Sequence, residues 1–249
     1  MKYIKSFEFE EKDLEPISSF KIKDELNPKI WENEDKMFDE IREQLLEITE
    51  DFYESTDLTA EIKDIILTGS LSNYNWSSRY SDFDLHIVID FNDVNDDYDL
   101  VKKLVTYAKN SWNNKYDLHI RGFEVEVYIQ DFNEPHTASG IFSLLNNKWN
   151  VKPVKKTFTP DEESIRMKAE SIMVDVDDLE KNSDNLDNEE FTELFEKVWD
   201  RIKRYRSEGL ETEAGEFSVG NLTFKLLRRN GYIGKLLKLK NESYENKFK

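Results

Sequence analysis

Polar and apolar residues alternate along the chain from Ser81 to Ile89. This alternation predicts a β-strand with one face in a core, because successive side chains of a strand point to opposite faces. One face would carry Phe83, Leu85 and Ile87. The opposite face would carry Asp82, Asp84 and His86. An unbroken apolar run just upstream, Ile65–Leu67, predicts a short buried strand.

Apolar residues recur at helical spacing both before and after these strands in the sequence. Between Pro28 and Ser55 it predicts one amphipathic helix with the apolar positions Ile30, Met37, Ile41, Leu45, Ile48 and Phe52. Residues 58–63 are expected to form a short helix or turn before the first strand, and residues 100–110 a second helix. The opening residues 1–28 are interpreted as an N-terminal arm that packs on the body or frays.

Two more strands are predicted within residues 116–131, meeting at Arg121–Gly122. In the second of them, one face would carry Glu124, Glu126 and Tyr128. Residues 133–154 are rich in turn-forming residues and are expected to form an ordered loop that closes the core. Part of this stretch could instead edge a functional site, namely His136, Thr137, Ser139 and Gly140.

The C-terminal part of the chain is predicted to form helices. They are predicted over residues 161–178, 189–208, 218–229 and 233–239, and Asn230–Gly231 resembles a glycine C-cap of the third. We therefore expect three parts: the arm at residues 1–28, a domain with the strands at 29–154, and a helical lobe at 155–249.

Charge and composition narrow the possible functions. The net charge is −18, and residues 1–100 hold 27 acidic and 10 basic side chains, against 26 and 25 in residues 101–249. Such an acidic surface disfavours broad nonspecific nucleic-acid binding. The chain has no cysteine, its three histidines lack zinc-motif spacing, and no apolar run approaches a membrane span. We expect a soluble cytoplasmic protein.

The strand of residues 81–89 carries the candidate chemistry. Asp82 and Asp84 would share a face, and carboxylates this close raise each other's pKa unless a cation lies between them. Mg²⁺ prefers oxygen ligands of this kind. Gly69–Ser70, which follow the first strand, offer a close backbone approach and a hydroxyl, both suited to a phosphate. Together these residues suggest a metal–nucleotide site.

The order of these motifs resembles the signature of polymerase-β-like nucleotidyltransferases. The resemblance covers the apolar strand, Gly69–Ser70, a polar loop and Asp82–Phe83–Asp84 within an apolar strand. It implies an α+β fold, with a small mixed-sheet nucleotidyltransferase core at residues 29–154, an N-terminal helix and a C-terminal helical lobe. It also implies a Gly-Ser turn that holds the triphosphate of an NTP, and carboxylates that hold two Mg²⁺ or Mn²⁺ ions. Residues 133–154 and 220–236 are similar to phage-associated nucleotidyltransferases.

In the family a third carboxylate comes from a later strand, and Glu126 is our candidate. Glu124 has the same strand parity, so periodicity leaves it open, and only the central position of Glu126 favours it. Arg79 could meet a phosphate, whereas Tyr74 and Trp76 could stack a base or anchor the loop. His86 is expected to support the site and not to react. One basic residue of the lobe could reach the triphosphate; the candidates are Lys197, Arg201, Lys203, Arg204, Arg206, Lys225, Arg228 and Arg229.

The resemblance implies transfer of NMP from an NTP to an acceptor hydroxyl, with release of pyrophosphate. The acidic surface favours a protein or small-molecule acceptor over RNA, and the donor base and oligomeric state stay open. Two alternatives also remain: a noncatalytic nucleotide-binding or protein-interaction module on the same fold, and an acidic structural or packaging protein whose motif is accidental.

Overall fold

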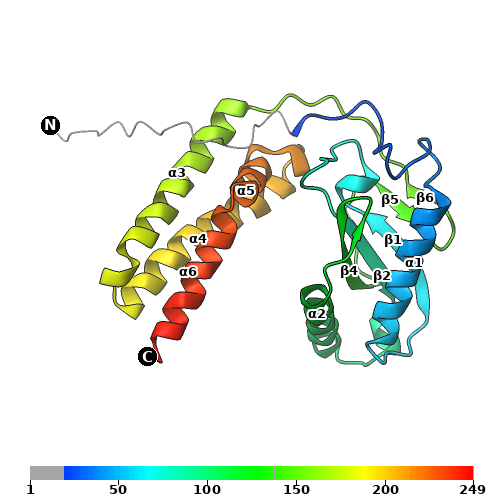
Figure 1. The fold of residues 1–249 in the computed structure, drawn as a ribbon, viewed down its shortest axis with the longest axis horizontal. Coiled ribbons are helices and arrows are strands. Elements are labelled where there is room, and N and C mark those ends of the chain that lie inside the picture. Colours follow the sequence, from blue (N-terminus) through cyan, green and yellow to red (C-terminus); the bar gives the residue numbers. More distant parts are fainter. Residues whose placement is uncertain (1–19, 137, 249) are drawn as a thin grey trace. The chain divides into compact units, whose positions relative to one another are not determined.

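The computed structural model describes residues 20–136 and 138–248, so most of the predicted N-terminal arm lies outside the described residues. The chain divides into two compact units (Figure 1). The sheet unit comprises residues 22–157, and the helical unit contains the described residues 20–21 and 158–248. Residues 22–28, assigned to the arm from the sequence, belong to the sheet unit.

The sheet unit is built on one mixed sheet of six strands in the order β3-β4-β2-β1-β5-β6. The strand bounds are β1 Ile62–Thr68, β2 Phe83–Ile89, β3 His119–Ile120, β4 Phe123–Asp131, β5 Ile141–Ser143 and β6 Lys148–Val151. β2 and β4 are parallel, and every other neighbouring pair is antiparallel. A parallel pair needs a long crossover, and this one contains helix α2, Tyr98–Lys115. The chain is therefore α+β, with a mixed sheet as expected.

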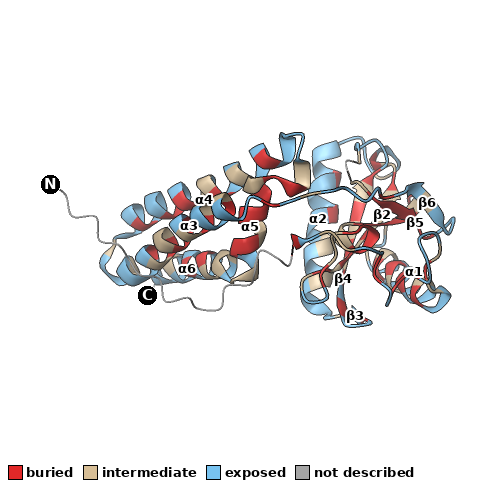
Figure 2. Ribbon diagram, turned by 90° about the horizontal axis from the view of Figure 1, so that it is seen from above, coloured by how far each residue is buried: buried red, intermediate tan, exposed pale blue. Residues whose placement is uncertain are grey.

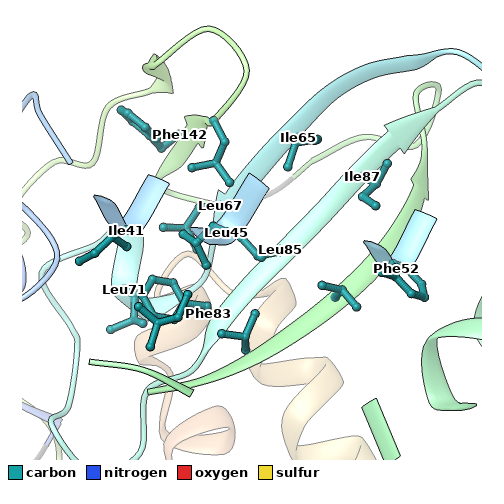
Figure 3. Packing of buried hydrophobic residues seen from close by; sticks show 14 of the residues in the cluster. Ile41, Leu45, Phe52, Ile65, Leu67, Leu71, Phe83, Leu85, Ile87 and Phe142 are labelled. Atoms are coloured by element: carbon teal, nitrogen blue, oxygen red, sulfur yellow. The ribbon is translucent and has the colours of Figure 1, made fainter. Parts of the chain in front are cut away.

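One face of the sheet forms the hydrophobic core. Along β2 the odd-numbered residues from Phe83 to Ile89 are buried and the even-numbered ones are half-buried, which confirms the alternation predicted from the sequence. Figure 3 shows Leu85 and Ile87 packed with residues of helix α1, Asp39–Glu54. Val101 and Val105 of α2 belong to the same cluster. Both helices thus cover the apolar face of the sheet.

The helix predicted from Pro28 begins only at Asp39, so the earlier part of that prediction is wrong. Ile30 and Met37 are buried as the apolar spacing suggested, but through turns and an isolated bridge between Trp31 and Met37. The Trp31 indole donates a hydrogen bond to the carbonyl of Leu71 at 2.9 Å. Tertiary contacts of this kind produce burial at helical spacing without a helix.

Two other local predictions also differ from the structure. Residues 58–61, expected to form a short helix or turn, are irregular with a bend at Ala60, and β1 already begins at Ile62. The stretch 133–154, expected to be a loop, contains the β5–β6 hairpin, in which Phe142 pairs with Trp149. Trp149 stacks on Trp31 at a centroid distance of 4.7 Å. This aromatic packing stabilises a hairpin whose strands are too short for a clear alternating pattern.

The described residues of the helical unit form four α-helices: α3 Glu162–Asn182, α4 Asn188–Glu211, α5 Val219–Arg229 and α6 Tyr232–Asn246. Asp187 and Glu190 form a capping box at the start of α4. Gly231, at φ 78°, separates α5 from α6 as the glycine signal indicated. In Figure 2 buried and exposed segments alternate along α3 and α4, as in amphipathic helices around a core of their own. None of the described helices is long and apolar enough to span a membrane.

Candidate functional site

A tight glycine–serine turn follows β1. Gly69 has φ 75°, and a Cβ atom there would overlap Oδ2 of Asp84. Glycine is therefore required both by the backbone conformation and by the close approach of the carboxylate. Ser70 opens a short 3₁₀ helix, Ser70–Ser72, and its Oγ lies 2.6 Å from Oγ of Ser81. The turn is thereby tied to the residue that precedes Asp82.

Buried serines that the sequence did not single out hold this turn. The fully buried Ser72 Oγ lies within hydrogen-bonding distance of the carbonyl oxygens of Gly69, at 3.0 Å, and Gly140, at 2.9 Å. Ser81 Oγ accepts a hydrogen bond from the Ser77 amide at 2.8 Å. Asn73 donates to Ser139 at 2.5 Å. Residues 139–140 thus pack against the turn, whereas Thr137 lies outside the described residues.

The aromatic residues of the following loop anchor it to the sheet unit. Tyr74 is 5% exposed, and its hydroxyl donates to Glu34 at 3.2 Å. The Trp76 indole donates to the carbonyl of Glu25 at 2.9 Å. Of the two interpretations left open for these rings, anchoring agrees with the contacts. Arg79 is exposed, with its Cζ 5.3 Å from the centroid of the Tyr80 ring.

The parallel register of β2 and β4 sets Glu126 directly beside Asp84. Thr68 of β1 pairs with Asp84 from the other side. Paired residues of neighbouring strands point to the same face, so both carboxylates lie on the polar face of the sheet, opposite the core. Asp82 directly precedes β2, on the side of the Gly69 turn.

Glu124 lies closer to the beginning of β4 than Glu126 does. It pairs with His119 of the two-residue strand β3 and is exposed, whereas Glu126 is half-buried. Partial desolvation of its carboxyl group raises the pKa of Glu124, and the negative charges of Glu126 and Asp82 raise it further. Negative charge is therefore concentrated at this end of β2 and β4.

Tyr128 fixes the carboxylate of Glu126 by donating a short hydrogen bond from its hydroxyl to Oε2. Its ring stacks on His86 at a centroid distance of 4.9 Å, and Nζ of Lys109 lies 4.0 Å from the ring centroid. Burial, the bond to Glu126 and the charge of Asp84 raise the pKa of Tyr128 well above its usual value. The phenol therefore stays protonated and remains a donor. The sequence analysis placed Tyr128 on this face but gave it no role; its parity with Glu126 was the available signal.

His86 lies beside Tyr128 on the polar face of the sheet and is half-buried. Burial lowers its pKa to about 4, and the nearby His136 contributes in the same direction. The ring is therefore neutral near pH 7 and packs against Tyr128 and, edge to face, against His136 at 5.3 Å. Among the described residues, His86 Nδ1 and His136 Nε2 are buried without a hydrogen-bond partner.

The carboxylate oxygens of Asp82, Asp84 and Glu126 are ligands of the type that a hard divalent cation prefers. The negative charges of Asp82, Asp84 and Glu126 all raise the pKa of Tyr128. A divalent cation would relieve this concentration of negative charge. Within residues 20–136 and 138–248, however, no three Asp, Glu or His side chains are grouped tightly enough to enclose a metal ion, and Glu126 is turned toward Tyr128.

Comparison of the chain with protein-family models, curated proteins and solved structures returned no match. The chemistry of the site therefore has to be inferred from its own residues.

Proposed function

We propose that the sheet unit is a metal-dependent nucleotidyltransferase that moves NMP from an NTP to an acceptor hydroxyl and releases pyrophosphate. The observation that carries the proposal is the register of β2 and β4, which brings Glu126 beside Asp84. The approach of Gly69 to the Asp84 carboxylate adds a phosphate-accommodating turn at the same place. This combination supports the resemblance to polymerase-β-like nucleotidyltransferases.

Each residue has a distinct role in the proposed reaction. Asp82, Asp84 and Glu126 would hold two Mg²⁺ or Mn²⁺ ions, and Tyr128 would orient Glu126 through its hydrogen bond. The Gly69–Ser70 turn and Arg79 hold the triphosphate of the NTP. When bound, the ions lower the pKa of the acceptor hydroxyl and neutralise charge on the leaving pyrophosphate. The acceptor oxygen bonds to the α-phosphorus as the bond to the bridging oxygen of the pyrophosphate breaks.

The large negative charge of the sheet unit favours a protein or small-molecule acceptor. Residues 22–157 carry 27 acidic and 15 basic side chains, which repel a long phosphodiester chain. The second candidate function is a noncatalytic nucleotide-binding or protein-interaction module on the same fold. The hydrogen bond from Tyr128 to Glu126 favours it, because it engages one oxygen of the proposed third carboxylate.

The test is a thermal shift of the purified chain with each NTP, with and without Mg²⁺, repeated on Asp84→Ala. We expect a Mg²⁺-dependent rise in Tm with at least one NTP, since a ligand that binds only the folded state stabilises it. Asp84→Ala should lose this rise while it keeps a cooperative unfolding transition. Absence of any shift at millimolar NTP would contradict the proposal.

A transfer assay then separates the two candidate functions. It follows release of pyrophosphate from the NTP that gave the shift, with candidate acceptors added in turn. Release that depends on the acceptor and on Asp84 would support the transferase. A thermal shift without release, with any acceptor tested, would support the noncatalytic module.

A further inference from the structure

A cluster of cations lies on helix α5 of the helical unit. Lys225, Arg228 and Arg229 are three and four residues apart, so they project from one face of the helix. Like charges at this spacing destabilise a helix. The negative end of the helix dipole offsets this repulsion for Arg228 and Arg229, which lie in the last turn of α5. It does not offset the repulsion for Lys225 in the middle of the helix.

Arg206 of helix α4 joins the cluster from the neighbouring helix. The two helices approach closely, because a Cβ at Gly220 would overlap the carbonyl oxygen of Tyr205. The Arg206 guanidinium lies over the ring of Phe224, with its Cζ 4.3 Å from the centroid. This cation–π contact holds the guanidinium beside the Lys225 face of α5. We call Arg206, Lys225 and Arg228 the α4–α5 cation cluster.

The members of the cluster act on one another electrostatically. Burial lowers the pKa of Lys225, the charges of Arg229, Arg228 and Arg206 lower it further, and Glu216 opposes them. Burial and the charge of Arg228 also lower the pKa of Arg206. The cations therefore lie close enough to destabilise one another's charged forms, a cost that a bound anion would remove.

Some other cations of the helical unit have carboxylate partners. Lys235 contacts Asp177 at 2.7 Å, and Arg201 contacts Asp175 at 2.9 Å. Within the described residues, no carboxylate lies within salt-bridge distance of a member of the α4–α5 cation cluster. In a chain with a net charge of −18, carboxylate partners are abundant. The charge of Glu216 favours the charged form of Lys225, but the charges of three arginines oppose it, so the cluster keeps an excess of positive charge that suits an external anion.

We propose that the α4–α5 cation cluster is a binding site for phosphoryl oxygens. A guanidinium offers paired donors to such oxygens, and the ammonium of Lys225 adds a point charge beside it. The phosphoryl group can belong to a free polyphosphate or to a phosphodiester chain. This proposal does not rest on the function proposed for the sheet unit.

The test uses the full chain, without divalent metal, and tripolyphosphate as the probe in a calorimetric titration. Arg206→Gln and Arg228→Gln should each weaken binding about tenfold, because each removes a charge-assisted contact. Lys238→Gln is the matched control and should leave the affinity unchanged, since Lys238 is an exposed cation of the same unit that pairs with Glu242. Lys225→Gln is the third variant, and thermal unfolding of each variant confirms that it is folded.

A second arm replaces tripolyphosphate with a short single-stranded oligonucleotide. Binding of the oligonucleotide with a salt slope reduced by about one in Arg206→Gln would assign a phosphodiester chain. Binding of tripolyphosphate alone would assign a free polyphosphate.

The variant Asp84→Ala tests whether binding depends on the site of the sheet unit. It should bind tripolyphosphate with the affinity of the wild type. Binding that is lost in Asp84→Ala, binding unaffected by all three cluster variants, or no binding of either probe would overturn the proposal.

Discussion

At the scale of single residues, Gly69 links the backbone of the turn to the position of the Asp84 carboxylate. An alanine there meets two separate difficulties. The positive φ of 75° disfavours any L side chain, and the new Cβ would force the carboxylate to move. Gly122 shares the first difficulty only, because it has φ 86° and open space around it.

We predict that Gly69→Ala destabilises the chain more than Gly122→Ala does. Backbone strain should cost each variant about 1–2 kcal/mol. The displacement of Asp84 should cost Gly69→Ala about 1 kcal/mol more. Urea unfolding of the two variants measures the difference in the free energy of unfolding. Equal losses would show that the Asp84 side chain moves aside at no cost.

His86 provides a residue-scale test based on pH. Burial lowers its folded pKa to about 4 from 6.5, so between these values the unfolded chain binds a proton that the folded chain does not. Stability contributed by the neutral ring is therefore present above pH 6.5 and is lost as the pH falls toward 4. The loss between about pH 7 and about pH 5 should be about 2 kcal/mol.

The variant His86→Gln isolates this contribution. It should be less stable near pH 7 because it loses the stacking on Tyr128, but its free energy of unfolding should fall less steeply toward pH 5. His136, whose pKa burial also lowers, remains in both proteins. Parallel pH profiles for the two proteins would contradict the assigned pKa.

At the scale of elements, the alternation within each strand was predictable and the pairing between strands was not. The period of two showed that Glu124 and Glu126 share a face, but parity alone cannot say which one lies beside Asp84. That depends on the register of β4 against β2, which is set across the α2 crossover. The β5–β6 hairpin and the turns of residues 28–38 were missed because tertiary contacts of Trp31 and Trp149 define them.

The register leads to a prediction about the two glutamates. Under the proposed function, Glu126→Gln should lower the rate of NMP transfer by at least about a hundredfold, the scale expected when an electrostatic group at the reacting centre is lost. Glu124→Gln is its matched control on the same strand and face. It should retain activity within a few-fold, because Glu124 pairs with His119 and not with Asp84. The transfer assay at saturating Mg²⁺ and NTP compares the two variants, and the reverse order of effects would exchange their roles.

At the scale of the whole molecule, charge is distributed unevenly between two units that have separate cores. The sheet unit carries 27 acidic and 15 basic side chains, and residues 158–249 carry 21 and 16. This imbalance was evident from the sequence. The sequence also pointed to Asp82, Asp84 and Glu126 and to the basic residues of α4 and α5. It could not show which of them lie side by side, because that depends on how separate elements meet.

The uneven charge predicts how salt affects stability. Repulsion within the sheet unit opposes its folding, so raising NaCl from about 50 mM to about 500 mM should raise Tm by screening it. MgCl₂ at the same ionic strength should raise Tm further if the carboxylates beside Gly69 bind the cation specifically. In Asp84→Ala the Mg²⁺ and Na⁺ curves should coincide, while the response to NaCl stays. An additional effect of Mg²⁺ that persists in Asp84→Ala would mean that the cation is held elsewhere on the acidic surface, and the proposed metal site would lose its support.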